Sequence, residues 1–90
     1  LSKSTPKQLV GYLEHASGWV RRQAQRLLVE KRAADMAPPL KKMAASAARP
    51  EVRVSALWTL DALGAADEEA ISTALGDTDA RIRKVAVRTA

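Results

Sequence analysis

The sequence predicts an all-α protein that folds as an α-α superhelix, with about three stacked helix pairs. Alanine supplies 18 of the 90 residues, phenylalanine is absent, and aromatic residues make up only 3%. This composition favours closely packed helices, because strands prefer β-branched and aromatic side chains. A short pattern also recurs three times along the chain. A repeat of about 20 to 50 residues is typical of stacked units that bury their apolar stripes against their neighbours.

The recurring pattern lies in the second helix of each predicted pair. Residues 19–26, 51–58 and 81–88 align at offsets of 32 and 30, with a β-branched residue, an arginine and an alanine in matching columns. Upstream of each segment, two apolar residues stand at i, i+4 spacing, which places both on one helical face. These apolar pairs, which follow one another at an offset of 31, are Leu9 with Leu13, Leu40 with Ala44, and Ile71 with Leu75.

Six helices and no strand are therefore expected in a single domain that covers residues 1–90. The repeats span about 5–32, 35–64 and 67–90. No low-complexity tract or long linker interrupts them, which favours one continuous domain. The expected helices cover roughly residues 5–15, 19–32, 37–48, 51–64, 67–75 and 79–90.

Capping signals mark the first and third helices. Residues 5–8 read TPKQ, a capping box in which Pro6 occupies the first helical position. The pair Pro38–Pro39 is expected in the first turn of the third helix or just before it. A proline deeper inside the helix would remove a hydrogen bond and clash with the preceding turn.

The later helices carry comparable signals. Pro50 begins the fourth helix, and Asp67 with two glutamates after it places negative charge at the positive end of the fifth. Gly64 and Gly76 stand where glycines commonly end helices. The sixth helix follows Asp79 and continues to the last residue without a capping signal.

The expected core follows from the helical faces that these boundaries define. On the fourth helix, Val52, Ala56, Leu60 and Leu63 form one apolar face that packs on its own partner helix, while Leu57 points towards a neighbouring pair. Alanines at matching positions allow close approach of helix backbones. The full predicted core is Leu9, Leu13, Val20, Ala24, Leu27, Leu28, Leu40, Met43, Val52, Ala56, Leu57, Leu60, Leu63, Ile71, Leu75, Ile82 and Ala86.

The third repeat resembles the HEAT repeat, a helix pair whose second helix opens with Asp, then Val-Arg, then Ala. Asp79, Ile82, Arg83 and Ala86 fit this order. The first two repeats have Ser-Gly and Arg-Pro at the turn where the family has an acidic residue. The ladder of turn carboxylates and arginines that the resemblance implies is therefore interrupted in this chain.

Two longer strings are similar to the HEAT segment of large bacterial membrane-bound dehydrogenase-like proteins. They are HASGWVRRQAQRLLVE at residues 15–30 and ALWTLDALG at residues 56–64. The resemblance implies a parent protein that joins a sugar-dehydrogenase-like propeller to HEAT repeats and a c-type cytochrome module, in the bacterial periplasm or at a membrane. Neither the propeller nor a CxxCH haem motif is present in these 90 residues, so the resemblance supplies no catalytic residue and no cofactor.

The residues themselves predict no catalytic, cofactor or metal site. His15 is the only histidine, and there is no cysteine, so zinc and haem ligand sets are missing and the redox compartment stays open. The acidic run at residues 67–69 is explained by helix capping, and the serines lack a partnered base. We therefore expect this segment not to be an enzyme.

The charge of the chain is unevenly distributed. The net charge is +5, and the successive thirds carry +3, +4 and −2, since basic and acidic residues number 5 and 2, 6 and 2, and 4 and 6. No apolar run approaches the roughly 20 residues that a membrane-spanning helix needs. The chain begins without methionine and ends inside a helical pattern at residues 87–90, which favours a fragment of a longer repeat array.

A candidate interaction face lies opposite the core stripe of the second helices. Positions five before, two before and two after each central alanine fall on that face at about 100° per residue. Glu51 also belongs to this set and lowers its charge to +4. The candidate interaction residues are Trp19, Arg22, Arg26, Val54, Trp58, Arg81, Lys84 and Arg88.

This face predicts a non-catalytic interaction scaffold, which binds a protein or a neighbouring domain of the same chain. Trp58 is expected to be incompletely buried between Arg26 and Arg88, with arginines as polar donors around it. Binding of a nucleic-acid backbone is the alternative, because a basic surface attracts phosphates and an indole can stack on a base. A purely structural spacer is a third reading, and the identity of the partner stays open.

Overall fold

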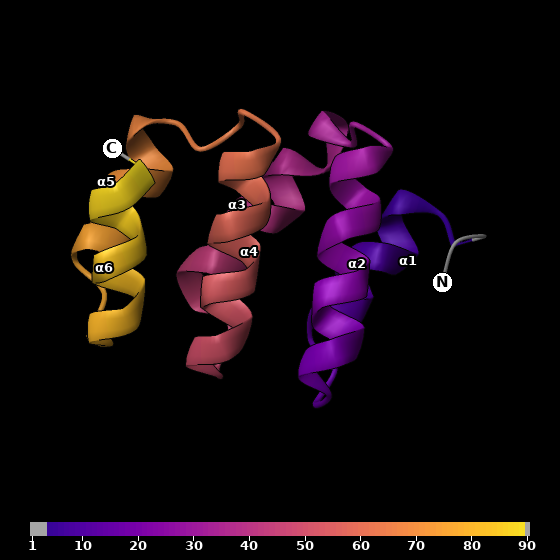
Figure 1. The fold of residues 1–90 in the computed structure, drawn as a ribbon. Coiled ribbons are helices and arrows are strands. Elements are labelled where there is room, and N and C mark those ends of the chain that lie inside the picture. The colour runs from indigo at the N-terminus through magenta and orange to yellow at the C-terminus, as the bar shows by residue number, and fades with distance from the viewer. Residues whose placement is uncertain (1–3, 90) are drawn as a thin grey trace.

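The computed structural model describes residues 4–89 and contains six α-helices and one short 3₁₀ helix in that range, with no strand (Figure 1). The all-α prediction is confirmed, and most boundaries agree with those expected to within three residues. The last predicted position, Ala90, lies outside the described residues. The elements are α1 (Pro6–Tyr12), α2 (Gly18–Glu30), η1 (Ala34–Met36), α3 (Ala37–Ser46), α4 (Pro50–Ala62), α5 (Glu68–Leu75) and α6 (Ala80–Thr89).

The helices pack in consecutive pairs. Helix α1 packs on α2, α3 on α4, and α5 on α6, while α4 also contacts α2 on one side and α6 on the other. Helix α3 contacts α5 as well. Figure 1 shows α2, α4 and α6 side by side and running in the same direction. These three helices form a single layer with α4 in the middle.

The predicted caps are present at the helix starts. Thr5 accepts a hydrogen bond from the Gln8 amide at 3.2 Å, and the Gln8 side chain accepts one from the Thr5 amide at 2.9 Å, which completes the capping box. Asp67 accepts from the amide of Ala70 at 2.9 Å at the start of α5. Pro50 is the first residue of α4. Both prolines of α3 lie in its first turn, as expected.

The turns include one element that was not anticipated, and they contain both of the expected glycines. The 3₁₀ helix η1 leads directly into α3, after Arg32 reverses the chain with a left-handed φ of 52°. Gly64 has φ +70° after α4, a conformation in which a Cβ is unfavourable. Gly76 ends α5 with φ −89°, so its position requires no glycine-specific conformation.

The core agrees with the predicted one for eleven of seventeen residues, and the differences follow from helix phase. Ala74 is 4% exposed whereas Leu75 is 44% exposed, so the prediction that Leu75 is buried is wrong. One residue turns a helix by about 100°, and the small Ala74 lets α5 approach its neighbours closely. Val20, Leu27, Met43, Leu63 and Ile71 are half-buried, while Val10, Ala33, Ala44, Thr59 and Val85 join the buried set.

An arginine holds the turn inside each helix pair. Arg21, Arg53 and Arg83 each donate to the carbonyl oxygen six residues earlier, at 2.8, 2.8 and 2.7 Å. These arginines occupy the matching column of the recurring pattern, next to the β-branched residue. The recurring sequence pattern therefore corresponds to a hydrogen bond that recurs in every helix pair.

Candidate binding groove

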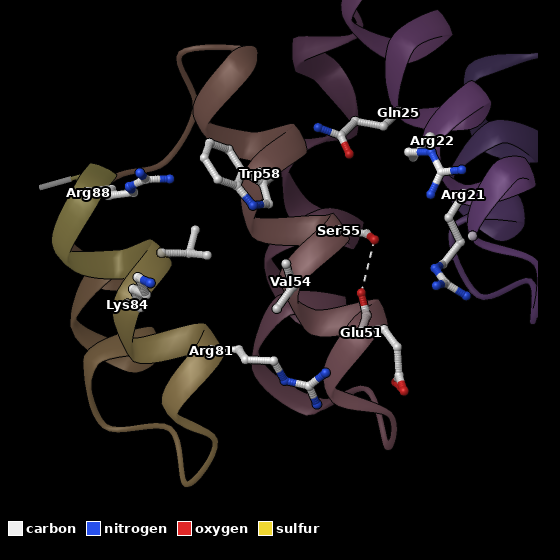
Figure 2. A pocket seen from close by; sticks show the side chains of 12 residues that line it. Arg21, Arg22, Gln25, Glu51, Val54, Ser55, Trp58, Arg81, Lys84 and Arg88 are labelled. Atoms are coloured by element: carbon white, nitrogen blue, oxygen red, sulfur yellow. Dashed lines mark hydrogen bonds between the residues drawn. The ribbon is translucent and has the colours of Figure 1, made fainter.

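A groove with a volume of about 680 Å³ crosses the layer formed by α2, α4 and α6 (Figure 2). We call it the basic groove, since five of its lining residues are basic and one is acidic. Its net formal charge is +4, or five positive charges minus one. The lining residues are Gly18, Arg21, Arg22 and Gln25 from α2, Glu51, Val54, Ser55 and Trp58 from α4, and Arg81, Lys84, Val85 and Arg88 from α6.

Helix α4 forms the floor of the basic groove. Glu51, Val54, Ser55 and Trp58 follow the spacing i, i+3, i+4 and i+7, so they share one face of the helix. Val54 and Trp58 are half-buried and pack against the core. The Ser55 hydroxyl donates to the Glu51 carbonyl at 2.9 Å and is satisfied within its own helix. The prediction that Trp58 is incompletely buried is confirmed.

The two walls carry the positive charges. Arg81, Lys84 and Arg88 extend from α6, whereas Arg21 and Arg22 extend from α2. Figure 2 shows Arg88 and Arg22 on opposite sides of Trp58, and it shows Arg81 and Glu51 towards the other end of the groove. The groove therefore has a Trp58 end and a Glu51 end.

Two of the five cations already bind acceptors in the protein. Arg81 makes a forked hydrogen bond to Asp79 at 3.2 and 3.1 Å, and this bond raises the pKa of Arg81 and lowers the pKa of Asp79. Arg21 donates to the carbonyls of His15 and Ala16 at 2.8 and 3.0 Å. Within residues 4–89, the side chains of Arg22, Lys84 and Arg88 make no ion pair and no hydrogen bond that would compensate their charge.

Gly18 leaves space for the side chain of one of these cations, Arg22. A Cβ placed on Gly18 would lie 3.1 Å from a terminal nitrogen of Arg22. The Arg22 guanidinium therefore folds back over the first turn of α2, in space that a larger residue would occupy.

Six of the eight predicted interaction residues line the basic groove, and two do not. Trp19 is 60% exposed in the first turn of α2, outside the lining. Arg26 pairs with Glu30 at 3.6 Å and faces a shallower neighbouring hollow, which shares only Arg22 and Gln25 with the groove. Of the two arginines that were expected beside Trp58, Arg88 lines the groove with it and Arg26 does not.

Sequence reasoning missed five lining residues: Gly18, Arg21, Gln25, Ser55 and Val85. Gln25, Ser55 and Val85 each adjoin one of the matching alanines, so a signal was present in the same alignment. Those positions point sideways towards the neighbouring helix of the layer, and the gap between two helices is what the groove occupies.

The lining of the groove contains one acidic side chain and no histidine or cysteine, so it has no set of metal ligands. Across residues 4–89, no group of three or more histidine, cysteine, aspartate or glutamate side chains is close enough to hold a metal ion. His15 accepts a hydrogen bond from the Ser17 amide at 3.0 Å, which stabilises the turn before α2. No helix in the described part of the chain is long and apolar enough to cross a bilayer.

No protein-family model, curated protein or solved structure matches this chain.

Proposed function

We propose that this chain is a HEAT-like module of an α-α superhelix and that it acts as a non-catalytic scaffold. Its basic groove binds another protein or a neighbouring domain of the same chain. The observation that carries the proposal is a half-buried Trp58 on the floor of the groove, with Arg22, Lys84 and Arg88 around it and without acidic partners in residues 4–89.

The helix arrangement supports the HEAT-like part of the proposal. Successive helix pairs contact one another mainly through α2, α4 and α6, so the second helices of the pairs lie next to each other. Each of these helices also repeats the same bond from an arginine to the carbonyl six residues earlier. Such stacks usually bind their partners on an extended surface formed by equivalent helices.

The composition of the groove supports protein binding. Tryptophan and arginine are enriched among the residues that dominate binding energy at protein interfaces. An indole offers a large apolar area with little conformational entropy to lose, and guanidinium groups donate in a planar fork that fits carboxylates. Trp58 with Arg22 and Arg88 provides both kinds of contact in one groove.

A nucleic-acid backbone is a weaker fit to the same groove. Glu51 would repel phosphates at one end, and Arg21 and Arg81 already bind acceptors in the protein. Stacking on a base needs an open aromatic face, whereas Trp58 is half-buried. We therefore treat nucleic-acid binding as an outcome that the experiment must be able to detect.

The test is a selection of random displayed peptides on the immobilised 90-residue chain, followed by mapping of the bound site by amide chemical shifts. We expect selected peptides to shift amides of α2, α4 and α6 around Trp58. Trp58→Ala should abolish this binding, while Trp19→Ala serves as the matched control because Trp19 lies outside the groove. Circular dichroism of both variants would show that the helices persist.

Two results would overturn the proposal. One is that selected peptides bind elsewhere or bind equally well to the Trp58→Ala protein. The other is that single-stranded DNA binds the groove more tightly than any selected peptide, with affinity that falls steeply with salt, as counterion release requires.

A further inference from the structure

We infer that the basic groove binds an acidic protein segment in one orientation, with carboxylates at the Trp58 end, an apolar side chain on Val54 and Trp58, and a hydrogen-bond donor at Glu51. This inference rests on the proposed function and specifies the chemistry of the partner. It follows from two differences between the ends of the groove and from the apolar strip that lies between them.

The first difference is the availability of positive charge. Arg22 and Arg88 flank Trp58, and Lys84 projects from α6 at the turn between Arg81 and Arg88. Their charges are not balanced by any acidic side chain among residues 4–89. At the other end, Asp79 neutralises Arg81 through two hydrogen bonds. A carboxylate of the partner therefore gains most at the Trp58 end, where it meets donors that have no competing acceptor.

The second difference is an unsatisfied acceptor. Glu51 Oε2 is buried and has no hydrogen-bond partner among the described residues. A buried carboxylate oxygen without a donor is costly, and a partner that supplies an N–H recovers that cost. Rotation of the half-buried Glu51 side chain would present this oxygen to a backbone amide or a basic side chain of the partner, whereas a second carboxylate at the same place is repelled.

The third feature is the apolar strip between the ends. Val54 and Trp58 lie one helical turn apart on α4, and both are half-buried. A branched aliphatic side chain on this strip excludes water from the charged contacts beside it, which strengthens them. An acidic segment without such a side chain would meet only solvated arginines, which bind weakly.

The test uses three synthetic peptides of equal length and the Trp19→Phe protein, in which Trp58 is the only tryptophan. The first peptide has acidic residues at one end, a leucine next to them and neutral residues at the other end. The second replaces the acids by their amides, and the third replaces the leucine by glycine. We expect Trp58 fluorescence to report binding of the first peptide, with affinity reduced about tenfold or more for the other two.

Matched protein variants separate specific contacts from net charge. Arg22→Glu and Arg88→Glu should each weaken the first peptide about tenfold, whereas Arg26→Glu, with the same charge change outside the groove, should weaken it no more than about twofold. A peptide with acids at both ends should bind less tightly than the first peptide. Glu51→Gln should remove that difference, since it removes the repelling charge.

The outcomes distinguish this inference from the proposed function. If the amide-containing peptide binds at Trp58 as tightly as the acidic one, the inference is wrong and the groove is still a protein-binding site. If Arg26→Glu weakens binding as much as Arg88→Glu, the attraction is unspecific and the inference also fails. If neither these peptides nor any selected one binds at Trp58, both the inference and the proposed function fall.

Discussion

The two interfaces between neighbouring helix pairs are built from different forces. The first interface lies between the α1–α2 and α3–α4 pairs, and the second lies between the α3–α4 and α5–α6 pairs. In the second interface, Arg53 binds Asp77 with two hydrogen bonds of 2.9 and 3.1 Å, and the two side chains are only 13% and 10% exposed. Lys41 of α3 also pairs with Asp67 at the start of α5. In the first interface, Arg49 donates to the Glu14 carbonyl, and no ion pair of residues 4–89 crosses it.

The uneven charge of the sequence explains this difference. The first interface brings together thirds of the chain with charges of +3 and +4, whereas the second brings together +4 and −2. Arg21 occupies the position that Arg53 has in the second pair, but Ala47 stands where the third pair has Asp77. Apolar contact and a hydrogen bond from Arg49 therefore hold the first interface, whereas apolar contact and ion pairs hold the second.

The largest expected effect tests the apolar contact that both interfaces share. Leu60 is fully buried in α4, the helix that contacts both neighbouring pairs. Leu60→Ala should lower the free energy of unfolding by about 2 to 5 kcal/mol, through lost transfer energy and the cavity left behind. Urea denaturation measures this loss in the free energy of unfolding. Leu75→Ala, at a leucine that is 44% exposed, should cost far less, and equal losses would contradict the assigned core.

The helices and the core were largely predictable because local signals and apolar periodicity agree. Pro50, Thr5 and Asp67 mark helix starts in the sequence, and the structure uses each of them as expected. The contacts between neighbouring helix pairs were harder to predict from the sequence. The resemblance draws attention to Asp79, but Asp77 is the residue that reaches Arg53. Which of two nearby carboxylates reaches a neighbouring pair depends on how α5 ends, and no spacing rule encodes that.

The sequence predicts the helical face on which the candidate site lies but not the full set of residues that line the groove. Opposite-face geometry, which depends only on the helical period, selects Trp58 and Arg88, and both line the groove. It also selects Trp19 and Arg26, which lie outside the groove. The width of the gap between helices, which sets the rim of a groove, is a property of packing and not of one helix.

The next effect concerns the buried pair of the second interface. Asp77→Asn removes the charge that Arg53 binds and leaves a guanidinium that is 13% exposed without its carboxylate. We expect a loss of about 1.5 to 3 kcal/mol in unfolding free energy, the range for hydrogen bonds between charged groups. Asp61→Asn, at an exposed aspartate of α4, is the control for net charge. A similar loss in both variants would mean that the pair contributes nothing specific.

A smaller change in stability, of opposite sign, is expected from a substitution that makes the first interface resemble the second. Ala47→Asp places a carboxylate at the position equivalent to Asp77, opposite Arg21. The new pair should stabilise the protein by about 0.5 to 1 kcal/mol, because residue 47 is half-buried and Arg21 is already held by two carbonyls. Thermal or urea unfolding of Ala47→Asp, Arg21→Met and the double variant isolates the coupling. Ala47→Asn should give no gain, and an equal gain there would rule out an ion pair.

The smallest expected effect is a pH dependence confined to the last helix pair. The Lys41 hydrogen bond lowers the pKa of Asp67 below 3.8, and the Arg81 hydrogen bond lowers the pKa of Asp79 in the same direction. A carboxyl group whose pKa is lower in the folded state stabilises the protein above its unfolded pKa, and this contribution is lost as the pH falls through the folded pKa. Stability should therefore be level above about pH 5 and decline below about pH 4.

Since Asp67 begins α5 and Asp79 precedes α6, acid should loosen these helices before it loosens α1 and α2. Amide exchange at a series of pH values, corrected for intrinsic rates, measures this order. Lys41→Met should reduce the contribution of Asp67 to this pH dependence. Added salt should also reduce that contribution in the unmodified protein, because the Lys41–Asp67 pair is solvent-exposed. Equal loss of protection in all six helices would show that the difference between the two interfaces does not reach the stability of individual pairs.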